Sequence, residues 1–118
     1  MKLAVFITCR NNSTRLPNKA LLNLYNDTTY IDYIFKRVHN IKTDCLKILS
    51  TCHGKENQIL INKAIDNNCL YYVGSEQDKL DRWLNTAKFY NIDFFVTIDG
   101  DDPFFDFNII DLAFDSYL

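Results

Sequence analysis

The sequence predicts an α/β domain in which helices cover both faces of a mainly parallel β-sheet. Four short apolar runs, rich in β-branched and aromatic residues, have the length and composition of buried strands. Amphipathic helical patterns separate these runs, so that strand and helix alternate four times with short connections, as in repeated parallel βαβ units. With 118 residues, of which 47% are hydrophobic, the chain suits a single domain over residues 1–118 with its own core.

Each predicted strand is short, apolar and free of proline. The strands are KLAVFIT at residues 2–8, LKILST at 46–51, CLYYV at 69–73 and DFFVTID at 93–99. Runs of this kind are typical of strands that are buried on both faces, as the strands of a parallel sheet are.

The predicted helices have apolar residues at three-and-four spacing on one face. Thr28 or Thr29 can cap the first helix, Ser75 or Asp78 can cap the third, and the fourth should begin near Asn108. The residues expected on the buried faces of the four helices are, in order, Ile31, Ile34, Phe35, Val38 and Ile41; Ile61, Ala64 and Ile65; Leu80, Trp83, Leu84 and Ala87; and Ile109, Ile110 and Ala113.

Composition argues against several classes of protein. No apolar run approaches the roughly 20 residues of a membrane span, and the opening MKLAVFITCR lacks a full signal-peptide core. We therefore expect a cytoplasmic protein without a membrane partner, and the net charge of −2 gives no reason to expect a nucleic-acid partner. The four cysteines show no CxxC pairing and are predicted to be buried free thiols rather than zinc ligands or disulfides.

Charge is unevenly distributed along the chain. The first 26 residues hold four cations and no acid, whereas seven aspartates and no cation follow Lys88. The basic loop, CRNNSTRLPNK at residues 9–19, follows the first strand, and the acidic stretch DGDDP follows the fourth. Because ligands of such sheets bind beyond the carboxyl ends of the strands, the two segments could together hold a polyphosphate and its divalent metal. The alternative is solvated charge at the two ends of a domain.

The basic loop has residue types that bind phosphate, because backbone amides and guanidinium groups both match phosphate oxygens. It lacks the glycines of the GxxxxGKS and GxGxxG motifs, so neither motif applies. From the loop alone, an equally weighted alternative is that Arg10 and Arg15 pair with acids on the surface.

Three stretches in the same order resemble one enzyme family. RNNSTRLPNKAL resembles the nucleotide-binding signature of the sugar cytidylyltransferases and is most similar to the branch of spore-coat polysaccharide biosynthesis. Related enzymes activate 3-deoxy-manno-octulosonate and acylneuraminate with CTP. GSEQDKLDRW resembles the Gly-Ser-x-x-Asp-x-Leu-Asp-Arg segment of that family, and IDGDDPFFDFNIID resembles its metal-binding segment with the helix that follows.

The resemblance implies a three-layer, Rossmann-like, glycosyltransferase-A-like fold of the nucleotide-diphospho-sugar transferases, and transfer of CMP from CTP to a sugar or sugar acid with release of pyrophosphate. It also implies a Mg²⁺ cofactor. Carried over by position, the triphosphate ligands are Arg10, Ser13, Arg15 and Lys19, of which Arg10 and Lys19 are the candidate catalytic residues. Asp81 and Arg82 would lie near the nucleotide, and Asp101, with Asp99 as its rival, would bind the metal.

The chain resembles the N-terminal half of the family's domain. We therefore expect a truncated fold that is inactive alone, and that needs a C-terminal partner half or forms a homo-oligomer. The aromatic residues expected to be exposed by such a truncation are Phe104, Phe105, Phe107 and Phe114. The alternative function is a non-catalytic module that binds a nucleotide or sugar nucleotide, and Mg²⁺-dependent pyrophosphate release would distinguish it from an enzyme.

Overall fold

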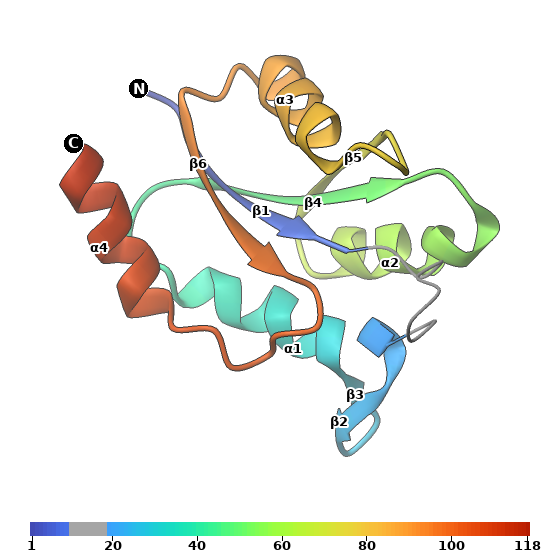
Figure 1. The fold of residues 1–118 in the computed structure, drawn as a ribbon. Helices are drawn as coiled ribbons and strands as arrows, with labels where there is room; N and C mark the ends of the chain where they lie inside the picture. The colour runs from blue at the N-terminus through green and yellow to red at the C-terminus, as the bar shows by residue number, and fades with distance from the viewer. Residues whose placement is uncertain (10–18) are drawn as a thin grey trace.

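A four-stranded parallel sheet forms the middle of the protein (Figure 1). The computed structural model describes residues 1–9 and 19–118. The order of the strands across the sheet is β5-β4-β1-β6, and every neighbouring pair is parallel. All four strands lie where the sequence predicts them, at β1 (Leu3–Thr8), β4 (Leu46–Cys52), β5 (Leu70–Gly74) and β6 (Phe94–Asp99).

Helices cover both faces of this sheet, which confirms the predicted three-layer α/β architecture (Figure 1). One face packs against α1 (Tyr30–Arg37), α2 (Lys55–Asp66) and α4 (Phe107–Tyr117), and the other packs against α3 (Lys79–Tyr90). Among the described helices, none has the length and apolarity that crossing a membrane requires.

Strand β1 lies at the centre of the core, and all six of its residues are buried. Its side chains alternate between the two faces, as the strand period requires. Val5 and Ile7 belong to the core under α1, α2 and α4, whereas Ala4 and Phe6 belong to the core under α3. On the α3 side, the ring of Phe6 stacks on the ring of Phe95 with 4.2 Å between centroids.

A short antiparallel hairpin, β2 (Asn23–Tyr25) and β3 (Thr28–Thr29), was not predicted. The chain turns at Asn26 and Asp27, whose φ angles are 43° and 58°. Asn and Asp tolerate the left-handed region, so this dipeptide was the available signal for a two-residue hairpin turn. Single turns of 3-10 helix, η1 (Lys19–Leu21) and η2 (Val38–Asn40), precede the hairpin and follow α1.

The structure corrects several predictions about which helical residues are buried. Leu80 and Leu84 of α3 are 66% and 58% exposed, and Ile109 of α4 and Ile65 of α2 are also exposed. In α3 the buried residues are instead the polar Arg82 and Thr86, two positions after Leu80 and Leu84. Trp83 and Ala87, also predicted on this face, are partly buried and pack against the core under α3, and Arg82 contacts the end of β1.

The expectation that four phenylalanines near the C-terminus would be exposed is wrong for most of them. Phe104 is 69% exposed, whereas Phe105 and Phe114 are buried and Phe107 is partly buried. The sheet face and α1 supply enough apolar surface to cover these rings. The prediction of free cysteines is confirmed, since all four are buried thiols.

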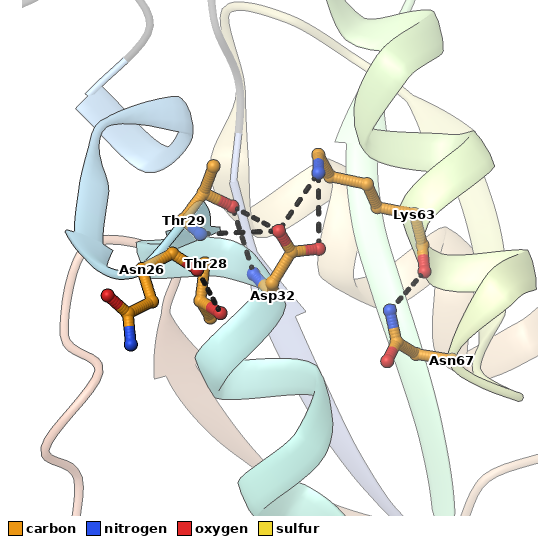
Figure 2. A network of polar contacts seen from close by, with 6 residues as sticks. All are labelled: Asn26, Thr28, Thr29, Asp32, Lys63 and Asn67. Atoms are coloured by element: carbon orange, nitrogen blue, oxygen red, sulfur yellow. Dashed lines mark hydrogen bonds and ion pairs between the residues drawn. The ribbon is translucent and has the colours of Figure 1, made fainter.

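Asp32 connects α1 to the hairpin and to α2 (Figure 2). Thr29 is the N-cap of α1, and its hydroxyl and amide both donate to the Asp32 carboxylate in a capping box. From α2, the ammonium of Lys63 lies 3.0 and 3.2 Å from the two carboxylate oxygens. Burial favours the neutral carboxyl, but the hydrogen bonds from Lys63 and Thr29 outweigh it and hold the pKa of Asp32 below its ordinary value of 3.8.

Lys63→Met is expected to destabilise the fold by about 1 to 2 kcal/mol near neutral pH, because a charge-assisted bond between half-buried groups is lost. The folded-state pKa of Asp32 is lowered, so its contribution is present above the unfolded-state value and is lost as the pH falls through the folded-state value. The difference between wild type and variant in denaturant unfolding should therefore shrink at about pH 3. An exposed control, Lys36→Met, should show no such trend, and an equal difference at both pH values would contradict this account of Asp32.

Candidate functional site

The carboxyl ends of β1 and β6 place Cys9, the described start of the basic loop, beside the acidic stretch. In the parallel register Thr8 of β1 pairs with Asp99 of β6 and with Ser50 of β4. The amide of Gly100 then donates to the carbonyl of Thr8 at 2.9 Å. The basic loop therefore leaves β1 directly beside the acidic turn, residues 99–102, as the topology of a parallel sheet predicts.

Gly100 lies very close to Cys9, the described start of the basic loop. A Cβ atom at this position would lie 2.5 Å from the Cβ of Cys9 and 2.6 Å from its Sγ. Only glycine fits there without displacement of the backbone of β1 or of the turn. Burial, together with the negative charge of Asp101, raises the pKa of the Cys9 thiol to about 12, although Arg82 opposes this effect. Cys9 is thus a neutral packing residue, and the effect of Asp101 on it reflects how near the acidic turn lies to the base of the loop.

The carboxylates of the acidic turn face solvent. Asp99, Asp101 and Asp102 are all exposed, and the amide of Asp102 closes the turn by donating to the carbonyl of Asp99 at 3.1 Å. The ammonium of Lys79, at the start of α3, lies 4.0 Å from Asp99. Because both side chains are more than half exposed, this pair contributes little to stability.

The donor set of the acidic turn fits a Mg²⁺ ion, which prefers carboxylate oxygens. Within the described residues, no group of three or more potential ligands converges on one point. Mg²⁺ commonly binds through one or two carboxylates, several waters and the phosphates of a substrate. Exposed carboxylates beside a basic loop suit a metal of that kind rather than an ion held in an all-protein cage.

Most of the predicted triphosphate ligands lie outside the described residues. Arg10, Ser13 and Arg15 fall within residues 10–18, and Lys19 is the first residue of η1, where only the backbone is described. The described flanks on either side are both anchored, because Cys9 and Ala20 belong to the same buried core cluster.

Asp81 and Arg82 lie in the first turn of α3, and only one of them faces solvent. Asp81 is exposed and accepts a hydrogen bond from Asn85 at 3.1 Å. Arg82 is 3% exposed. Its guanidinium donates to the Ser75 carbonyl at 2.9 Å and to the Thr8 hydroxyl at 3.1 Å. These two hydrogen bonds connect the loop after β5 to the last residue of β1.

Sequence reasoning missed the partners that set this geometry. Thr8 and Ser75 receive the guanidinium of Arg82, and Lys79 brings a cation to the acidic turn. Lys79 occupies a variable position within the segment GSEQDKLDRW, so no motif pointed to it. A shallow hollow of about 380 Å³ lies elsewhere, near the amino end of β5, and includes none of the predicted site residues.

Comparison with known proteins gives the family of this chain. The sequence model of the cytidylyltransferases matches residues 4–118, which is nearly the whole chain. The chain belongs to the cytidylyltransferase family. It is also 34% identical over 111 residues to an uncharacterised protein of Methanocaldococcus jannaschii, an alignment that covers 94% of this chain and 45% of that protein.

Two solved structures confirm the fold. A cytidylyltransferase from Leptospira borgpetersenii serovar Hardjo-bovis superposes with a TM-score of 0.91 at 34% identity, over 98% of this chain and 48% of that one. A CMP:2-keto-3-deoxy-manno-octonic acid synthetase complexed with CTP superposes with a TM-score of 0.81 over 98% of this chain and 47% of that one. At 17% identity, the second comparison concerns the fold alone. This cytidylyltransferase chain spans about half the length of each of these relatives.

Gly100→Ala tests the close approach between the acidic turn and β1. The added methyl group would collide with Cys9, so we expect a loss of about 1 to 3 kcal/mol in the free energy of unfolding. Denaturant unfolding measures this loss, and Asp102→Ala in the same turn is the control because that side chain is exposed. Equal stability of the Gly100→Ala variant and the wild type would show that the turn lies further from β1.

Proposed function

We propose that this chain carries the nucleotide-binding part of an enzyme that transfers CMP from CTP to a sugar or sugar acid and releases pyrophosphate. The observation that supports the proposal most is the placement of the acidic turn beside the start of the basic loop, at the carboxyl edge of the sheet. Membership of the cytidylyltransferase family supports the nucleotide, and the structural neighbour complexed with CTP is consistent with it.

In the proposed reaction a hydroxyl of the sugar attacks the α-phosphorus of CTP, and the bond from that phosphorus to the bridging oxygen of the β-phosphate breaks. Pyrophosphate gains charge as it leaves, so positioning and charge neutralisation supply most of the catalysis. Arg10 and Arg15 would offer planar forks to the phosphate oxygens, Ser13 a hydroxyl donor, and Lys19 a point charge to the β- or γ-phosphate.

The acidic turn would hold the metal of this reaction. Asp101 is the proposed Mg²⁺ ligand, and Asp99 is the alternative. When it is bound, Mg²⁺ would neutralise negative charge on the phosphates. Asp99 lies 4.0 Å from the ammonium of Lys79, at the start of α3. Arg82 would hold the end of β1 in place through its hydrogen bond to Thr8. The carboxylate of Asp81 is exposed to solvent, where it would contact the nucleotide.

The remaining features of the proposal follow from the resemblance. These are a product used in surface polysaccharide biosynthesis, and a homo-oligomer or a C-terminal partner half. A cytoplasmic location is proposed from the sequence itself, on the ground given above. The test is release of pyrophosphate from CTP, with Mg²⁺, by this chain together with the proposed C-terminal half, across a panel of neutral sugars and sugar acids. Release that depends on one class of sugar supports the enzyme, whereas CTP binding without release under every condition would favour a binding module.

Lys19→Ala should weaken the binding of CTP by about 1.5 to 3 kcal/mol, which is the range for a charge-assisted contact. CMP should lose much less, because it has no β- or γ-phosphate. Calorimetry of both nucleotides on the variant and on a control, Lys88→Ala in the last turn of α3, measures the difference. Equal losses for CTP and CMP would exclude the proposed contact of Lys19 with the outer phosphates.

Asp101→Asn keeps the shape of the side chain but removes its charge, so Mg²⁺ should no longer strengthen CTP binding in this variant. Asp99→Asn should retain most of the effect of Mg²⁺. Titration of CTP with Mg²⁺ and with EDTA on both variants provides the comparison. The opposite pattern, in which Asp99→Asn alone abolishes the effect, would assign the metal to Asp99.

A further inference from the structure

We propose that Arg37, at the end of α1, is a positioning residue that sets where the acidic turn lies. This inference rests on the proposed function of the turn as the metal-binding segment. Arg37 acts on that turn through the segment that follows it, residues 103–107.

The contact between Arg37 and this segment has three components. The guanidinium donates to the carbonyl of Pro103 at 2.6 Å, a short charge-assisted bond. It also lies over the ring of Phe105, 4.8 Å from the centroid, and 5.3 Å from the centroid of the Phe107 ring. A planar cation can stack on rings and donate to a carbonyl at the same time, which an ammonium group does less well.

The acidic turn is consequently anchored at both ends. On one side Gly100 donates to Thr8 and packs against Cys9, which fixes the turn to β1. On the other side the buried Pro103 is held by Arg37, which fixes the turn to α1. Only Asp101 and Asp102 lie between the two anchors, so their backbone has little freedom to move independently.

Helix α1 is itself well fixed, so Arg37 is a rigid point of attachment. Ile34 and Phe35, in the preceding turn, are fully buried, and the N-terminus of α1 is held by the capping box and by Lys63 (Figure 2). The segment between β6 and α4 passes alongside α1 in Figure 1, in agreement with the contact between Arg37 and Pro103. Helix α1 packs in the same core cluster as Ala20, the residue that follows the basic loop. Through α1, the acidic turn is therefore attached to the core that also holds the end of that loop.

A ligand-free measurement tests the positioning directly. Arg37→Met keeps an unbranched side chain of similar helix propensity but removes the charge and the donors. In this variant, amide hydrogen exchange should accelerate about tenfold or more at two positions: Gly100, whose amide donates to Thr8 of β1, and Asp102, whose amide closes the turn. The acceleration is measured relative to Ala64 in α2, which reports global stability. Arg37→Lys should give an intermediate effect, and Lys36→Met, an exposed neighbour, should give none.

A binding measurement tests the consequence for the metal. Arg37→Met should leave CTP binding in EDTA within about twofold of wild type, but it should reduce the strengthening of CTP binding by Mg²⁺ about tenfold. Arg37→Lys should retain part of the strengthening of CTP binding by Mg²⁺. The inference is overturned if exchange rises equally at Gly100 and Ala64, or if the Mg²⁺ effect survives in Arg37→Met. If the wild type itself binds no CTP, the proposed function fails, and the exchange experiment alone still decides whether Arg37 positions the turn.

Discussion

The pairing of β1 with β6 is the constraint on which the candidate site depends. These two strands are far apart in the sequence, yet their parallel register places Thr8 beside Asp99, and the hydrogen bond from Gly100 to Thr8 continues the pairing by one step. Because β1 is buried along its whole length, a shift in this register would expose apolar residues on both faces. Burial of β1 therefore fixes the position of the acidic turn beside Cys9, the described start of the basic loop.

Contacts with side chains from three helices refine that placement. Arg82 of α3 holds the end of β1 from one face of the sheet, and Arg37 of α1 holds the segment after the acidic turn from the other. Asp111 of α4 accepts hydrogen bonds from the amides of Lys42 and Thr43, so the helix after the acidic turn is also attached to the body of the domain. The exposed carboxylates thus sit on a rigid support, which is what an electrostatic site requires.

Much of this arrangement could be predicted from the sequence, and the limits have physical causes. The strands were predictable because buried parallel strands are continuous apolar runs, and their alternation with helices placed both charged segments at one edge. The buried face of α3 was predicted only in part: Trp83 and Ala87 pack on the core, but the polar Arg82 is buried while Leu80 is exposed. The contacts of Arg37 with Pro103 and of Arg82 with Thr8 join residues 66 and 74 positions apart, and no periodicity encodes such pairs.

The central claim is that CTP and its metal bind at the carboxyl edge formed by β1 and β6. Substitution of Mn²⁺ for Mg²⁺ tests it most directly, since a paramagnetic ion broadens the amide resonances nearest to it. With CTP and Mn²⁺ present, the resonances of Cys9 and Gly100 should broaden, while that of Asp93, at the other end of β6, should stay sharp. Broadening centred on Asp93, or none that depends on CTP, would contradict this placement of the nucleotide.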